Sequence, residues 1–134
     1  MARLRLSVLR LARRIRQRAD TGLTPSQLSA LATIERHGAM HPTSLGHHER
    51  ISKSSVTRLL VNLEAQGQIR RLPDPADGRS TFVDLTDEGR DLLRTFSVQA
   101  DAFLARQVEA LSGEDRRRLA AAVPVLERLL DIRT

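Results

Sequence analysis

The chain has 134 residues, which is enough for one domain or one compact unit with a buried core. Hydrophobic residues make up 40% of the chain but aromatic residues only 2%, which argues against the exposed stacking platforms that bind single strands. The chain has no cysteine, so disulfides, thiolate metal sites, cysteine nucleophiles and thiol redox sensing are excluded.

The positive charge is unevenly distributed. A formal net charge of +6 suits a polyanionic partner. However, seven arginines and no acid lie in the first 18 residues, whereas basic and acidic side chains nearly balance over residues 19–86 and 87–134. Charge alone therefore does not locate a binding surface. No apolar run approaches the roughly 20 residues that span a bilayer, so we expect a soluble, cytoplasmic protein with no membrane partner.

The first 19 residues have the pattern of an amphipathic helix. Leu4, Val8, Leu11 and Ile15 recur at helical spacing, and residues 20–22 are expected to end the helix. An arginine-rich, acid-free start is also typical of mitochondrial targeting peptides. Because the apolar stripe leads directly into further structured pattern, we favour a folded helix over a cleaved leader.

Three more helices are expected before residue 67. Thr24-Pro25 is typical of a helix start, and Gly38 is expected to end that helix. A short helix fits residues 43–50. Ser52 is the expected cap of the next helix, in which apolar residues recur with helical spacing as far as Gly67.

The pattern then changes to that of a β-hairpin followed by two long helices. Residues 69–72 and 81–85 have the pattern of short strands around a turn rich in Pro, Asp and Gly. Thr86 is the expected cap of a long helix, and Ser112 that of a last helix, with Asp115 as its capping partner. These two helices carry more apolar side chains than one small unit can bury, which predicts a dimer interface.

Two helices joined by a short turn and followed by a hairpin predict a winged helix-turn-helix, whose second helix enters the DNA major groove. The candidate DNA contacts on that helix are Lys53, Ser54, Ser55, Thr57, Arg58 and Asn62. Ser54, Arg58 and Asn62 lie one turn apart, and Arg and Asn suit guanine and adenine. Lys53 and Thr57 are expected at phosphates. The alternative interpretation is an ordinary solvated helix face.

The hairpin turn contains the sharper feature, Asp77-Gly78-Arg79. Gly78 permits a tight turn. Asp77 is close enough in sequence to orient the Arg79 guanidinium toward a narrow, electronegative minor groove. The alternative is a surface ion pair without function.

Together these motifs resemble those of a known family, the MarR-type regulators. The stretches that carry the resemblance are residues 52–59, Leu63-Glu64 and Gly67 in the helix, and residues 77–79, Val83, Leu85-Thr86 and Gly89 around the wing. The resemblance covers nearly the whole chain. It implies a mainly α fold with a small β-hairpin wing, in which residues 24–86 bind DNA and residues 1–20 and 87–134 form dimerisation helices.

The resemblance also implies a function. It implies a homodimeric transcriptional regulator that binds double-stranded DNA at a pseudo-palindromic operator, and that is nucleoid-associated when bound. Arg79 is then the wing arginine and Asp77 its orienting partner. Thr43 and Ser44, at the start of the preceding helix, are expected to hold phosphates.

A small-molecule effector is part of the same implication. Many relatives release DNA when a small, often aromatic anion lodges between the dimer helices and the reader, and repression is the commoner mode of regulation in the family. From charge alone, Arg13 or Arg16 is expected to receive such an anion.

Three residues depart from the family pattern. Glu49 stands where an apolar residue is more common, and Arg50 where a small turn residue is common. If Glu49 is buried it needs a partner, for which Arg50 or Arg58 is expected, and the latter pairing would occupy a base reader. Pro124 is expected to kink or break the last helix.

Other classes of function are disfavoured. The four histidines, His37, His41, His47 and His48, are interpreted as surface or interface residues rather than metal ligands. No paired nucleophile and base, P-loop, dinucleotide-binding glycine pattern or HExxH motif is present, so we expect neither an enzyme nor a cofactor. The remaining alternative is a winged-helix dimer that binds another protein and lacks the strong salt dependence of DNA binding.

Overall fold

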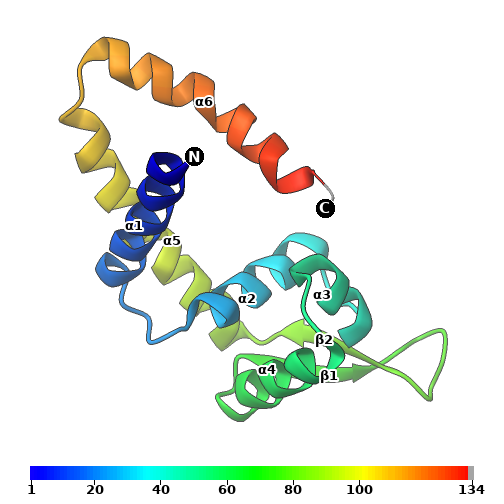
Figure 1. Cartoon of the computed structure of the whole chain (residues 1–134). Coiled ribbons are helices and arrows are strands. Elements are labelled where there is room, and N and C mark those ends of the chain that lie inside the picture. The colour runs from blue at the N-terminus through cyan, green and yellow to red at the C-terminus, as the bar shows by residue number, and fades with distance from the viewer. Residues whose placement is uncertain (133–134) are drawn as a thin grey trace.

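The computed structural model describes residues 1–132 and is mainly helical, with one β-hairpin (Figure 1). In chain order its elements are α1 (Ala2–Arg18), α2 (Pro25–His37), α3 (Pro42–Glu49), α4 (Lys53–Ala65), β1 (Ile69–Pro73), β2 (Thr81–Leu85), α5 (Asp87–Glu109) and α6 (Gly113–Asp131). The expected helices and strands are all present, and the fold is that of a winged helix-turn-helix with flanking helices.

Side-chain caps start four helices where the sequence indicated. The capping residues are Thr24, Ser52, Thr86 and Ser112. Before α2 the cap is reciprocal, because Thr24 Oγ1 accepts from the Gln27 amide and Gln27 Oε1 accepts from the Thr24 amide. At α6, Ser112 Oγ accepts from the amide of its expected partner Asp115 at 3.1 Å, while the Asp115 carboxylate lies 3.5 Å from Arg118.

The main core lies between α2, α3, α4 and the hairpin. Its largest fully buried side chains are Leu31, Ile34, Leu45, Leu60, Leu63, Ile69, Val83 and Leu85. The strands pair antiparallel with Ile69 opposite Leu85, and the alternation in β2 turns Val83 and Leu85 inward. Met40, just before α3, forms an isolated bridge with Val83 and ties the helix-turn-helix to the sheet.

The junction between the hairpin and α5 is tightly packed. The Thr86 amide donates to the Gln68 carbonyl at 3.1 Å, and the Thr86 hydroxyl donates to the Gly67 carbonyl. A Cβ atom on Gly89 would lie 2.2 Å from the Gln68 carbonyl oxygen. Glycine is therefore required for α5 to pass this close to the start of β1.

The flanking helices leave large apolar faces open. α1 lies beside α5, whereas α6 stands apart from the rest of the chain (Figure 1). No residue of α1 or α6 is buried. Their exposed apolar side chains include Leu4, Leu6, Val8, Leu9 and Leu11, and Leu119, Val123, Val125, Leu126, Leu129 and Leu130. Among residues 1–132, no helix has the length and apolar character needed to cross a bilayer.

Pro124 was expected to kink or break the last helix, and of these two outcomes the break is not found, since α6 continues through Pro124 to Asp131. Proline removes one hydrogen bond to the carbonyl four residues earlier, which here belongs to Ala120. Ala120 is exposed, so water can satisfy that carbonyl without ending the helix.

Candidate nucleic-acid interface

One face of α4 presents the candidate base readers to solvent. Ser54, Arg58 and Asn62 are exposed at one-turn spacing, on the side opposite the buried Val56 and Leu60. Within residues 1–132, no side-chain hydrogen bond or ion pair engages Arg58 or Asn62. The arrangement leaves both polar ends able to reach base edges in a groove.

The hydroxyl groups near the start of α4 are partly used by the helix itself. Ser52 Oγ accepts from the Ser55 amide at 3.2 Å and lies 2.9 Å from the half-buried Ser55 hydroxyl. Thr57 Oγ1 donates to the Lys53 carbonyl at 3.0 Å. Ser55 is therefore placed primarily in the cap, while the Lys53 ammonium remains exposed beside it.

The start of α3 offers backbone amides. Thr43 is exposed and Ser44 half-buried in the first turn, directly after Pro42. His41 occupies the cap position, but its side chain makes no capping bond to this helix. Thr43 and Ser44 thus keep amides and hydroxyls of the kind that bind phosphate oxygens.

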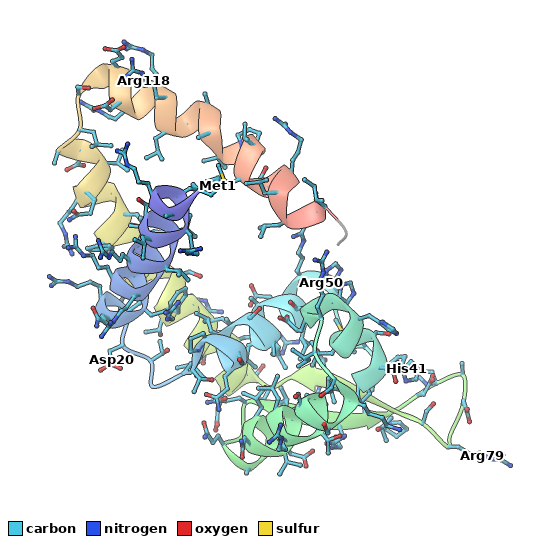
Figure 2. The ribbon with its side chains drawn as sticks, viewed as in Figure 1. Met1, Asp20, His41, Arg50, Arg79 and Arg118 are labelled. Atoms are coloured by element: carbon cyan, nitrogen blue, oxygen red, sulfur yellow. The ribbon has the colours of Figure 1, made fainter. Side chains whose placement is uncertain are left out.

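The wing carries Asp77 and Arg79 at its exposed tip, and Arg79 points away from the body of the protein (Figure 2). Asp77 does not contact the Arg79 guanidinium in this structure. Asp77 Oδ1 accepts from the Arg79 backbone amide at 3.0 Å, and the described residues contain no ion pair between the two side chains. Asp77 thereby shapes the turn. An Asp side chain readily accepts a hydrogen bond from the backbone amide two residues later, which closes an Asx-turn.

Asp74 at the base of the wing was not singled out from the sequence, although Asp in a Pro-rich turn is a recognisable signal. Its buried carboxylate accepts from the Ala76 amide at 2.8 Å and from Ser80 Oγ at 3.2 Å. The Ala76 amide lowers the pKa of Asp74 below its ordinary value of 3.8. Ser80 and His41 lower it further, and together they outweigh the opposing effect of desolvation.

Glu49 is half-buried, but the expectation that an arginine pairs with it is wrong. Its carboxylate accepts from Ser29 Oγ at 2.7 Å and from Thr33 Oγ1 at 2.5 Å, both on α2. The packing of α2 against α3 brings these hydroxyls to the end of α3. Arg58 is consequently not occupied by Glu49.

The histidines fall into separate places. His37 and His48 stack with ring centroids 4.2 Å apart, while His41 Nε2 lies 3.0 Å from Asp74 Oδ2. His47 is exposed on α3. Among residues 1–132 no three His, Asp or Glu side chains gather in a way that would hold a metal ion.

A cavity of about 470 Å³ lies between α1, α2 and α5, behind the helix-turn-helix. Its apolar lining includes Ile15, Leu28, Leu93 and Phe96, and its polar lining includes Ser29, Glu35, Arg36 and Ser97. Of the two candidate effector residues, Arg16 lines this cavity and Arg13 does not. Arg36 and Ser29 were not predicted, because only the packing of α2 against α1 and α5 brings them to the cavity.

The chain is similar to known transcriptional regulators in sequence and in structure. The model of the MarR family matches residues 23–81. An HTH-type transcriptional regulator of Mycobacterium tuberculosis is 34% identical over 96% of this chain and 90% of its own length. A crystal structure of a Pseudomonas aeruginosa protein, 36% identical, superposes with a TM-score of 0.82 over 98% of this chain and 94% of that one. A Staphylococcus aureus MepR mutant bound to an oligodeoxyribonucleotide has a TM-score of 0.71 at 22% identity, over 95% and 94% of the two chains.

Proposed function

Since the chain belongs to the MarR family of transcriptional regulators, we propose that it is a homodimer that reads a pseudo-palindromic DNA operator. The observation that carries the proposal is that Arg58 and Asn62, whose side chains form no hydrogen bond or ion pair within residues 1–132, are exposed on α4 while Arg79 is exposed at the wing tip. The MepR mutant with the same fold was crystallised on DNA, which supports DNA as the partner. Membership of a regulator family also disfavours an enzyme.

The contacts divide into two kinds. Arg58 and Asn62 supply base readout in the major groove, where a bidentate pair discriminates by about 1–3 kcal/mol against a wrong base. Lys53, Thr43 and Ser44 supply phosphate contacts, which fix the register of α4 without reading sequence. Arg79 extends the footprint into the neighbouring minor groove, where a narrow groove attracts a guanidinium.

The dimer is proposed to form through α1, α5 and α6. α6 has no buried residue and exposes Leu126 by 39% and Leu130 by 78% within one protomer. Covering each such side chain contributes roughly 1.5–3 kcal/mol, so a second copy that covers α6 and the open face of α1 is strongly favoured. A two-fold dimer in turn explains why an operator would be a pseudo-palindrome.

The cavity between α1, α2 and α5 is the proposed effector site. Its volume of about 470 Å³ suits a small organic ligand, and its mainly apolar wall suits an aromatic ring. Arg16 and Arg36 supply positive charge for an anionic group, partly offset by Glu35. Arg13 has no part in this proposed site, since it does not line the cavity.

A hydrogen bond links this cavity to the reader. Ser29 lines the cavity and donates to Glu49, which lies three residues before Ser52, the cap of α4. An anion that takes the Ser29 hydroxyl competes with Glu49 for it. The proposed result is a shift of α3 and α4 relative to α2, which lowers DNA affinity and relieves repression.

The first experiment is selection of bound genomic fragments by the purified protein, beside Arg58→Ala, Arg79→Ala and the control Arg118→Ala. Arg118→Ala removes the same charge at the end of the molecule remote from Arg79 (Figure 2). We expect enrichment of an inverted repeat with half-sites about one helical turn, roughly 34–36 Å, apart. Arg58→Ala should relax one base position, Arg79→Ala should weaken binding at all sites, and Arg118→Ala should change neither.

Salt dependence tests the nature of the partner. For 6–10 phosphate contacts, affinity should fall by about 10³–10⁵ between 50 and 200 mM salt. No enrichment by the wild-type protein at moderate salt would refute DNA reading and direct the search to a protein partner.

The effector proposal is tested with salicylate and the variants Arg13→Ala and Arg16→Ala. Salicylate should raise the melting temperature of the wild type and of Arg13→Ala, but not of Arg16→Ala. Salicylate should also weaken DNA binding, and Ser29→Ala should reduce that effect more than it reduces ligand binding. Equal responses of the two arginine variants would refute the assignment of the anion to Arg16.

A further inference from the structure

His41 lies at the base of the wing, between the helix-turn-helix and the hairpin (Figure 2). Its Nε2 is 3.0 Å from Asp74 Oδ2. Its ring meets the Phe82 ring edge-on, with centroids 4.5 Å apart and planes at 78°. The cap residue of α3 therefore contacts Asp74, directly after β1, and Phe82, the second residue of β2.

Asp74 holds both ends of the wing loop. Its carboxylate accepts from the Ala76 amide and the Ser80 hydroxyl, and its own amide donates to the Ser80 carbonyl at 3.1 Å. The Asp74 side chain is only 7% exposed, whereas that of His41 is 39% exposed. The orientation of Asp74 thus governs the path of residues 75–80, which carry Arg79.

The backbone next to His41 is also fixed to the hairpin. The Met40 amide donates to the Val83 carbonyl at 3.1 Å, and the Val83 amide donates to the Met40 carbonyl at 2.8 Å. His41 follows directly, so its ring is held where it reaches both the Phe82 ring and the Asp74 carboxylate. The same short segment begins α3, which leads through residues 50–52 into α4.

We propose that His41 and Asp74 are positioning residues that hold the wing, and with it Arg79, in a fixed relation to the reading face of α4. The proposal rests on the DNA-binding function proposed above. A wing held in this way loses less conformational entropy on binding, so Arg58 and Arg79 engage one site together. Without the pair, the main hairpin register remains, but the loop beyond residue 73 loses its anchor.

The test is a set of double-mutant cycles on a selected operator fragment, measured by fluorescence anisotropy. His41→Ala should weaken binding about 3- to 10-fold, as expected for ordering one or two side chains, and His41→Gln should recover most of it because a carboxamide can donate to Asp74. In the Arg79→Ala background, His41→Ala should cause no further loss. An equal loss in both backgrounds would overturn the proposal, since His41 would then act independently of the wing.

His48→Ala is the matched control. His48 lies on α3, of which His41 is the cap residue, and its imidazole stacks on His37 and not on the hairpin. Amide hydrogen exchange of Ala76, Arg79 and Ser80 should accelerate in His41→Ala and remain unchanged in His48→Ala. Unchanged exchange in His41→Ala overturns the proposal whatever the DNA result. If the wild type binds no DNA but exchange accelerates as expected, the DNA-binding function fails while the wing anchor stands. If His41→Ala does not fold, the same exchange comparison is made with His41→Gln and Asp74→Asn, where only Asp74→Asn should accelerate.

Discussion

The contact between Gly89 and the Gln68 carbonyl oxygen makes a sharp prediction about stability. A Cβ at position 89 would lie 2.2 Å from that oxygen and 3.1 Å from its carbon. Both are backbone atoms, so no side-chain rotation can relieve the overlap. In Gly89→Ala, α5 must therefore move away from β1, which strains the bond from the Thr86 amide to Gln68.

The expected cost follows from two opposing effects. Overpacking against a rigid neighbour costs about 1–3 kcal/mol, and a backbone neighbour places this site at the upper end. Alanine recovers less than about 1 kcal/mol of helix propensity in a first turn. The net loss is about 2 kcal/mol in the free energy of unfolding, equivalent to roughly 8 °C in melting temperature for a chain of this size.

The assay is thermal and urea unfolding at one fixed protein concentration, since dimer formation makes stability depend on concentration. Gly113→Ala is the control. It also stands in the first turn of a helix, but its Cβ would meet only the Arg117 guanidinium, at 3.5 Å. Gly113→Ala should be neutral or slightly stabilising. The expected difference in melting temperature between the two variants is roughly 8 °C. A difference of less than about 2 °C would refute the close approach of α5 to the Gln68 carbonyl.

Three further predictions test other contacts. Ser52→Ala removes the cap of α4 and should cost about 1 kcal/mol in urea unfolding, and an unchanged midpoint would exclude the cap seen here. Glu49→Ala leaves the Ser29 and Thr33 hydroxyls without their acceptor and should cost about 1–2 kcal/mol, whereas Glu49→Gln should cost less; equal costs would show that the bonds contribute little. The pKa of Asp74 is lowered, chiefly by the Ala76 amide, so the stability it contributes is present above its unfolded pKa near 3.8 and lost as pH falls through the lower folded value. The side-chain carboxyl carbon shift of Asp74 should then show its protonation midpoint below 3.8, and a midpoint at or above 3.8 would contradict this assignment.

The local structure and much of the fold follow from the amino-acid pattern. Thr24, Ser52 and Thr86 cap helices at the expected places because a cap bonds to an amide three residues along the same chain. The apolar spacing likewise determined which face of α4 is buried and therefore that Arg58 is exposed. Such features depend on neighbours within a few residues, which the sequence states directly.

Which side chains meet across elements depends on how the helices and strands pack. Ser29 and Glu49 are 20 residues apart, and their contact depends on how α2 packs against α3. His41 reaches Asp74 because Met40 is bonded to β2, and Arg16 rather than Arg13 lines the cavity because of how α1 lies on α5. The charge pattern in the sequence leaves several possible partners for each charged group. The packing of the helices selects one of them, because polar bonds form only between groups that burial of the apolar faces has already brought together.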